Sequence, residues 1–241
     1  IEAIEAQRII KRIISEGWMV RDMHEVDLAN NPKTRPIRLD DICILSPTRT
    51  GVKSILHELD NASIPYRLES ADMVFETEEI SDLITCLQAI DNPKDYVSII
   101  ATLKSPIFGC SDVDIFRYMN FGNSLNALEQ DSSSAGLVGK SLEIIRRFYL
   151  KKTVVSVPRL IEEIIRERAL AGYALTEKWP RERWRKYQLI IDKARILSDK
   201  SPTTLGYFIE WMNKQINSGV QSLESAVPDS DENAVRIMTI H

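Results

Sequence analysis

Apolar residues recur at helical spacing along most of this chain, and short apolar runs interrupt that pattern near both ends. The first helical pattern is IEAIEAQRIIKRIISEG, in which isoleucines share one stripe until Gly17, a good helix terminator. The pattern predicts a packed amphipathic helix. The stripe consists of Ile1, Ile4, Ile9, Ile10, Ile13 and Ile14.

The next segment predicts a strand, a loop, a helix and a second strand. NNPKTRP is expected to be a polar loop, and DDICIL after it predicts a strand near Ile42–Leu45. SPTRTG then leads into the amphipathic VKSILHELDNA, and IPYRLES predicts a strand near Tyr66–Leu68. This order is the α/β unit of a parallel sheet.

From FETEEISDLITCLQAID onward the spacing is helical until the acidic ESAVPDSDEN, after which AVRIMTI predicts a strand near Val235–Ile240. Ser111 with Asp114, and Ser156 before Val157-Pro158, have the pattern of helix starts. The predicted fold class is therefore α/β, a partial Rossmann-like parallel sheet with a large all-helical insertion. The return strand should pair beside the Ile42–Leu45 strand, because the chain must re-enter the sheet it left.

Composition and charge narrow the class of protein. Three scattered cysteines (Cys43, Cys86, Cys110) give no disulfide framework and no CxxC pair, which favours a reducing compartment. No apolar run approaches the ~18 residues of a membrane span, and no basic-then-apolar leader opens the chain, so we expect a soluble, cytoplasmic protein without a membrane partner. Between Lys140 and Arg195 there are 15 basic and 7 acidic residues, although the whole chain has a net charge of −4. A cationic middle is typical of a segment that faces polyanions, and equally of solvated helices.

The loop SPTRTG is the first candidate for chemistry. Ligands in open α/β sheets lie beyond the carboxyl ends of strands, where a helix N-terminus presents free amides. The loop supplies hydroxyl groups, a permissive glycine and a cation, at Ser46, Thr48, Thr50, Gly51 and Arg49. Either a phosphate site or an ordinary Ser/Thr/Pro-rich turn fits these residues.

The ordered series DICILSPTRTG, IPYR, FETEEISDL and NAVRIMTIH resembles the second motor domain of UvrD/Rep/RecB-like superfamily 1 DNA helicases. The resemblance spans almost the whole chain, including the helical insertion. It implies three parts: residues 1–135 as the first part of a RecA-like motor domain, 136–230 as the insertion, and 231–241 as a truncated return strand.

Not every functional residue of that family transfers to this chain. Where the family has an adenine-stacking aromatic residue and then a phosphate-binding Arg, this sequence has Ser46 and Pro47. Arg49 is the nearby cation, and its guanidinium suits a phosphate contact. Phe75, Glu76 and Glu79 match the family's aromatic-Glu helix start, where capping by glutamate and a ligand contact are both open readings.

The resemblance also implies two DNA surfaces. Thr239 and His241 match family positions that contact the backbone of single-stranded DNA, although a frayed terminal strand needs no ligand. The segment EKWPRERWRKYQLIIDKAR interleaves aromatic and basic residues, and the resemblance implies that this insertion contacts duplex DNA. Its helical spacing favours a core stripe of Trp184, Tyr187, Ile191 and Ala194 with charges outward. The expected phosphate contacts are Arg181, Arg183, Arg185 and Lys186.

The chain has no GxxxxGK[ST] loop and no acidic pair of the kind that holds magnesium. We therefore expect no ATP hydrolysis and no metal site in these residues alone. The resemblance implies a parent ATP-dependent DNA helicase of repair or recombination, with ATP and Mg²⁺ as cofactors of the intact protein, and with a nuclease domain or partner subunit left open. The alternative is a non-catalytic module that binds nucleic acid or protein.

Overall fold

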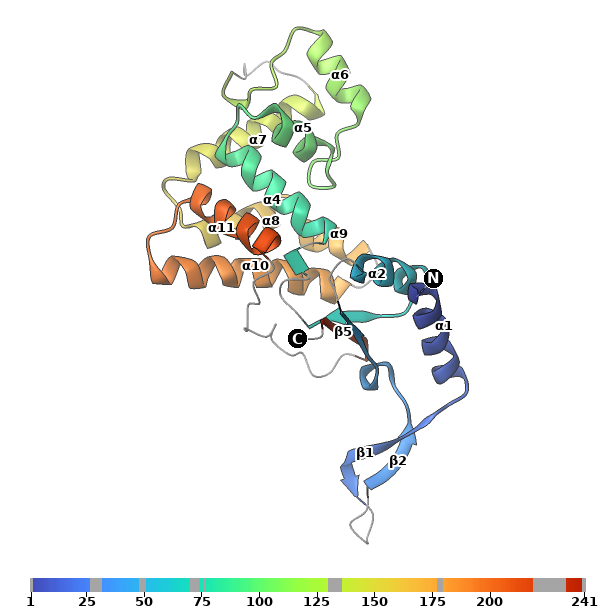
Figure 1. The fold of residues 1–241 in the computed structure, drawn as a ribbon. Helices are drawn as coiled ribbons and strands as arrows, with labels where there is room; N and C mark the ends of the chain where they lie inside the picture. Colours follow the sequence, from blue (N-terminus) through green and yellow to red (C-terminus); the bar gives the residue numbers. More distant parts are fainter. Residues whose placement is uncertain are drawn as a thin grey trace. The chain divides into compact units, whose positions relative to one another are not determined.

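The computed structural model describes residues 2–26, 32–47, 51–69, 74–75, 77–129, 136–176, 180–218 and 233–239. The chain forms two compact units (Figure 1). Ile1–Met73 together with Ser222–His241 make the sheet unit, and Val74–Gln221 make the helical unit.

The sheet unit has three parallel strands at its centre: β3 (Cys43–Ser46), β4 (Tyr66–Leu68) and β5 (Val235–Thr239). Their order is β3-β5-β4, so the return strand pairs beside β3 as predicted and is also the middle strand. Val235 and Ile237 of β5 are completely buried. The predicted α/β fold class is confirmed. The helix α2 (Val52–Asn61), which connects β3 to β4, lies beside the sheet (Figure 1).

The first helix, α1 (Glu2–Ser15), ends before Gly17, whose φ of 62° is a conformation that glycine adopts without strain. Its isoleucine stripe is less buried than predicted. Of the described isoleucines in the stripe, Ile10 is buried, whereas Ile4, Ile9 and Ile14 are 40–48% exposed. The prediction of a packed helix is wrong for these positions because α1 packs mainly on α2, and one neighbouring helix covers only part of its circumference.

A β-hairpin follows α1, and the sequence patterns did not predict it. Strand β1 (Met19–Val26) pairs antiparallel with β2 (Pro32–Pro36), which lies where a polar loop was expected. Arg35 of β2 donates from Nε to Asp22 at 3.1 Å and from Nη1 to Asp41 at 2.6 Å. Asp41 closes the short 3₁₀ helix η1 (Leu39–Asp41), so one guanidinium joins the hairpin to the turn that precedes β3.

The helical unit is made of eight α-helices in its described residues, with the short η2 (Ala127–Glu129) among them. The capping box of Ser111 and Asp114 is present, and Ser156 is the N-cap of a helix with Pro158 in its first turn. The helices are α4 (Glu78–Asp91), α5 (Tyr96–Lys104), α6 (Asp112–Asn120), α7 (Leu137–Lys151), α8 (Val157–Glu167), α9 (Leu170–Thr176), α10 (Pro180–Lys200) and α11 (Leu205–Ser218).

The helical unit includes residues that the sequence assigned to the first part of the motor domain. It begins at Val74 rather than at 136, because α4 packs on α5, α7 and α11 and carries a continuous run of buried side chains. Phe75, only 1% exposed, meets Trp211 of α11 edge to face, with ring centroids 6.5 Å apart.

Three helix ends meet where α4 and α7 finish and α11 begins. Lys152, the C-cap of α7, donates from Nζ to the Asp91 carbonyl oxygen at 2.7 Å and to Asp91 Oδ1 at 2.8 Å. A Cβ on Gly206 would lie 3.0 Å from Asp91 Oδ2. Because Lys152 holds the carboxylate, Asp91 cannot move away freely. The glycine at 206 is therefore explained by the close approach of a tethered side chain.

We predict that Gly206→Ala destabilises the chain by about 1 kcal/mol net, because the clash with Asp91 outweighs the gain in helix propensity. The matched control is Gly172→Ala in α9, where the nearest heavy atom to the added Cβ is 4.0 Å away. The control should be neutral or stabilising. Urea unfolding followed by far-UV circular dichroism measures both, and equal effects of the two substitutions would contradict the clash.

Candidate functional site at the carboxyl edge of the sheet

The carboxyl ends of β3 and β5 bring two predicted functional segments to one edge of the sheet. In the parallel register, Ser46 is the partner of Thr239. The predicted nucleotide loop follows Ser46 in the sequence, and Thr239 is the predicted DNA contact on the neighbouring strand. Thr48, Arg49, Thr50, Glu76, Trp179 and His241 lie outside the described residues, and the side chain of Thr239 is not described.

The start of α2 lies close to this edge. Gly51 is its N-cap and makes no side-chain cap hydrogen bond. A Cβ added at Gly51 would lie 3.7 Å from Ser46 Oγ. The buried end of β3 and the start of α2 are therefore close together. Backbone amides at a helix N-terminus attract anions. The described part of the site is therefore a helix N-terminus close to the buried end of β3.

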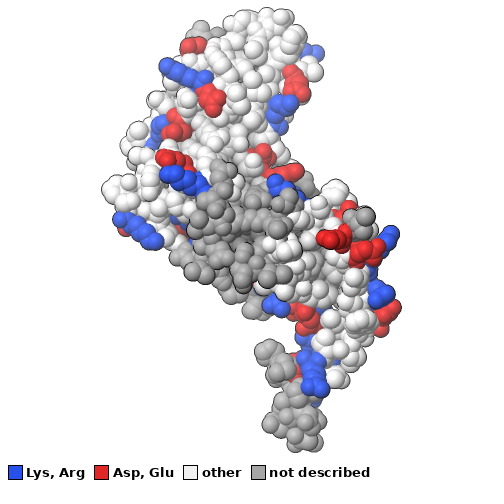
Figure 2. All heavy atoms as spheres, in the orientation of Figure 1, with Lys and Arg blue, Asp and Glu red and all other residues white. Residues whose placement is uncertain are grey.

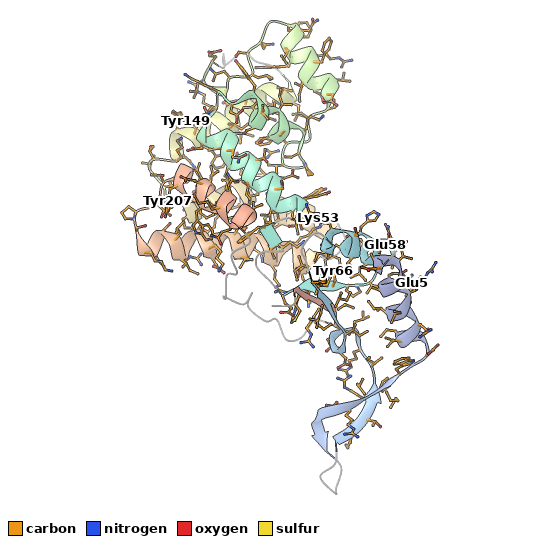
Figure 3. The ribbon with its side chains drawn as sticks, viewed as in Figure 1. Glu5, Lys53, Glu58, Tyr66, Tyr149 and Tyr207 are labelled. Carbon is orange, nitrogen blue, oxygen red and sulfur yellow. The ribbon has the colours of Figure 1, made fainter. Side chains whose placement is uncertain are left out.

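Lys53 is a cation in the first turn of α2 that the sequence patterns did not single out. It is exposed, and Figure 3 shows it on this helix. A lysine at a helix N-terminus opposes the helix dipole, so a bound anion would relieve an unfavourable interaction there. The sequence signal that could have identified Lys53 is a basic residue two positions after Gly51.

Asn233 fixes the alignment of the two strands. Its Oδ1 accepts hydrogen bonds from the backbone N–H of Leu39 at 2.7 Å and from that of Asp40 at 3.3 Å. These amides open η1, immediately before β3, and Asn233 stands shortly before β5. The Asn233 side chain therefore connects the residues before β5 to the residues before β3. This connection favours the register that places Ser46 beside Thr239.

The predicted duplex-binding residues lie on α10 with different exposures. Arg181 is exposed, and Arg183 and Arg185 are partly buried. Arg185 donates to Glu182 at 3.3 Å, and Glu182 is itself only 3% exposed. Figure 2 shows basic and acidic side chains interspersed over the drawn face of the helical unit. The positive charge of this segment is therefore partly neutralised within its own helix.

Lys186 has a different place from the one predicted. It is 4% exposed, and its Nζ donates to Glu79 Oε1 of α4 at 2.7 Å. A buried, ion-paired ammonium is not presented to a phosphate backbone, so the prediction of a DNA contact for Lys186 is wrong. The helical stripe of the sequence explains the error, because Lys186 lies beside Tyr187 on the inward side of α10, whereas Trp184 is 41% exposed.

Glu79 stays ionised because of its ion pair with Lys186. Burial of its carboxyl group acts to raise its pKa, but attraction to Lys186 and the hydrogen bond from Lys186 outweigh that effect. The pKa of Glu79 is consequently lower than that of an ordinary glutamate. The role of Glu79 in the structure is to hold α10 against the first turn of α4.

The described residues were also searched for a metal site and for a membrane-spanning helix. Among them, no group of three or more His, Cys, Asp or Glu side chains could hold a metal ion. No described helix combines the length and apolarity needed to span a bilayer.

Comparison with known proteins identifies the family. Residues 15–241 match the UvrD-like helicase C-terminal domain. The chain belongs to this family. The resemblance drawn from the sequence is thereby confirmed.

The chain is also similar to bacterial proteins that are each named as a subunit of an ATP-dependent helicase/nuclease. It is 26% identical to that of Leuconostoc mesenteroides subsp. mesenteroides over 99% of the chain and 19% of the relative. It is 24% identical to that of Enterococcus faecalis, over 96% of the chain and 19% of the relative. For Clostridium kluyveri the identity is 28% over 86% of the chain and 18% of the relative. The UvrD-like domain thus spans about a fifth of the length of these relatives.

We predict that Asn233→Ala weakens the pairing of β5 with β3, because two amides of η1 lose their acceptor. The expected cost is about 1 kcal/mol, roughly a fivefold shift in local opening. Hydrogen exchange of the Arg236 amide, which donates to the Ile42 carbonyl oxygen at 3.0 Å, measures it. Asn233→Asp keeps an acceptor oxygen and should recover most of the protection. Unchanged exchange in Asn233→Ala would show that the register is set elsewhere.

We predict that Lys186→Met destabilises the helical unit by about 3–5 kcal/mol at neutral pH, because a buried carboxylate loses its counter-charge. The double variant Glu79→Leu/Lys186→Met should be close to wild type, since an apolar pair of similar size replaces the ions. Urea unfolding measures both. Equal losses in the single and double variants would contradict the ion-pair account.

The pH dependence of stability provides a second test of the ion pair between Glu79 and Lys186. In the wild type the Glu79 pKa is lowered, so its contribution to stability is present above the ordinary carboxyl range and is lost as the pH falls through the lowered pKa. In Lys186→Met, burial is left as the main influence and raises the pKa of Glu79. The deficit of the variant should therefore shrink on acidification.

Proposed function

We propose that this chain forms part of the second motor domain of an ATP-dependent DNA helicase or translocase of repair or recombination. The observation that carries the proposal is the register of the parallel sheet, in which the loop after Ser46 and the strand end at Thr239 share one edge. A nucleotide-dependent movement of that loop would act on the neighbouring, hydrogen-bonded strand end. Family membership supports the motor assignment.

The nucleotide side of the site consists of Ser46, Thr48, Arg49, Thr50 and Gly51. ATP supplies the free energy for movement when it is bound in the intact protein. The start of α2, whose N-cap Gly51 has no side chain, fits its phosphates, and Arg49 would neutralise phosphate charge. Lys53 is a second cation for this role. No acidic cluster of the described residues suits Mg²⁺, so the metal would be held elsewhere in the intact protein, and this chain alone should not hydrolyse ATP.

The DNA side has two surfaces. Thr239 and His241 would donate to phosphate oxygens of single-stranded DNA, which needs no base reading. Arg181, Arg183 and Arg185 would contact duplex DNA through its backbone, with Arg181 the most accessible. Lys186 is left out, since it holds α10 in place and thereby positions these arginines.

The name of the relatives describes a helicase/nuclease with more than one polypeptide, so we propose that this motor domain works in the cytoplasm together with a nuclease domain or a partner subunit. The alternative function is a non-catalytic module that binds nucleic acid or protein through the helical unit. The neutralisation of Arg185 by Glu182 is the observation that favours it.

Salt dependence of DNA binding separates the two functions. We predict that the affinity of the chain for duplex DNA falls steeply with salt, and that Arg181→Ala/Arg183→Ala lowers the log–log slope by about two. Lys200→Ala is the matched control, because Lys200 is an exposed cation of the same helix. Fluorescence anisotropy measures the slopes. The same slope in the double variant as in wild type would favour the protein-binding module.

A further inference from the structure

The first turns of α10 carry an aromatic side chain that the helical unit does not fully bury. Trp184 is 41% exposed, whereas Tyr187 and Ile191 of the same helix are 4% and 3% exposed. The sequence pattern placed these three residues in one core stripe, and the structure separates Trp184 from the other two. An indole ring has a large apolar face, and neither core packing nor the proposed phosphate contacts account for the exposed part of this one.

The neighbours of Trp184 on the helix surface indicate what kind of ligand would use the ring. Arg181 precedes Trp184 by three residues and Gln188 follows it by four, and residues at these spacings are neighbours on a helix. Arg181 is exposed, and Gln188 is partly buried. An aromatic ring for stacking beside a guanidinium for phosphate is the combination that binds a single nucleotide unit of a nucleic acid strand.

Phosphate contacts alone would give α10 little affinity for nucleic acid. Lys186 is buried, and Arg185 is paired with Glu182. Arg181 and the partly buried Arg183 are the other two predicted contacts. A contact that does not depend on charge would therefore matter here. Stacking is such a contact, and it requires an unpaired base, because a duplex keeps the faces of its bases within its own stack.

We propose that Trp184 stacks on an unpaired nucleobase and that Arg181 contacts a phosphate of the same strand. The ligand is single-stranded nucleic acid, bound without selection among the bases, because every base has a face that can stack. The inference rests on the proposed function in one respect, that α10 faces DNA. It adds an unpaired nucleotide and a salt-independent contact to a surface for which only phosphate contacts to duplex DNA were proposed.

Variants of Trp184 test the stacking contact, with a fluorescently labelled thymidine oligonucleotide as the probe and anisotropy as the measurement. Trp184→Leu should weaken binding about tenfold at every salt concentration, because an aliphatic side chain cannot stack on a base. The log–log slope against salt should stay as in the wild type, because no charge is removed. Trp184→Phe should retain most of the affinity. Wild-type affinity in Trp184→Leu overturns the proposal, and a lowered slope does so too, since Trp184 would then act by placing a cation.

Two control variants separate stacking from charge and from the loss of any exposed ring. Arg181→Ala should lower the slope by about one, because one phosphate contact is lost. Tyr207→Leu removes a different exposed aromatic side chain, which is 50% exposed on α11 (Figure 3), and should bind like the wild type. Far-UV circular dichroism confirms that each variant is folded. An equal loss of affinity in Tyr207→Leu and Trp184→Leu overturns the assignment of the base to Trp184.

An oligonucleotide without bases tests the proposal with no substitution in the protein. The wild type should bind a strand of abasic nucleotides about as weakly as Trp184→Leu binds the thymidine strand, and equal wild-type affinity for the two strands overturns the proposal. Ultraviolet irradiation of a strand that contains 5-iodouracil should cross-link it to Trp184, which mass spectrometry identifies. Cross-links confined to other residues overturn the stacking contact. Both measurements use the wild type, so they decide the matter even if Trp184→Leu fails to fold.

The results also separate this inference from the proposed function. If Arg181→Ala/Arg183→Ala lowers the salt slope for duplex DNA while Trp184→Leu binds the thymidine strand like the wild type, the proposed function stands and the inference fails. If the arginine substitutions leave the duplex slope unchanged while Trp184→Leu loses affinity for the thymidine strand alone, the duplex surface fails and the unpaired base at Trp184 stands.

Discussion

The placement of β5 between β3 and β4 is the constraint on which the sheet unit depends. β3 and β4 do not pair with each other; each pairs with β5. Strand β5 follows the whole helical unit in the sequence. The free energy of its pairing must therefore offset the entropy lost on closing a very long loop. Buried Val235 and Ile237 and the two hydrogen bonds accepted by Asn233 supply that stabilisation. The common edge on which the proposed nucleotide and DNA contacts lie is a consequence of this pairing.

The cationic segment shows why the charge of a sequence does not locate a binding surface. Lys186 and Arg185 are both basic, yet one is buried against Glu79 and the other is paired with Glu182 of its own helix. Burial of a charge is tolerated only with a partner, so the acidic neighbours of these cations are needed for the helix to pack. Arg181 is left as the accessible cation of the four predicted on α10. Binding of duplex DNA by this helix would therefore depend on few phosphate contacts.

The two faces of the sheet illustrate a related point. Both arginines at the β4–β5 register lie on one face, and Glu69 matches Arg67 while Arg236 remains without a hydrogen-bond partner at Nε among the described residues. A parallel sheet of this kind usually lies between two layers of helices, which cover both of its faces.

The sequence by itself determined most element types and the return strand, because hydrophobic period and helix-start residues such as Ser111 and Asp114 are local signals. The resemblance of its ordered motifs indicated the family. It missed the hairpin, whose strand Pro32–Pro36 has no apolar alternation and is held by Arg35. It also misplaced Lys186, because a single helix cannot show which of its charges will meet a carboxylate from a helix about 100 residues earlier. Only the tertiary structure decided which cations are buried and paired, since that choice depends on the desolvation of both partners when distant segments pack together.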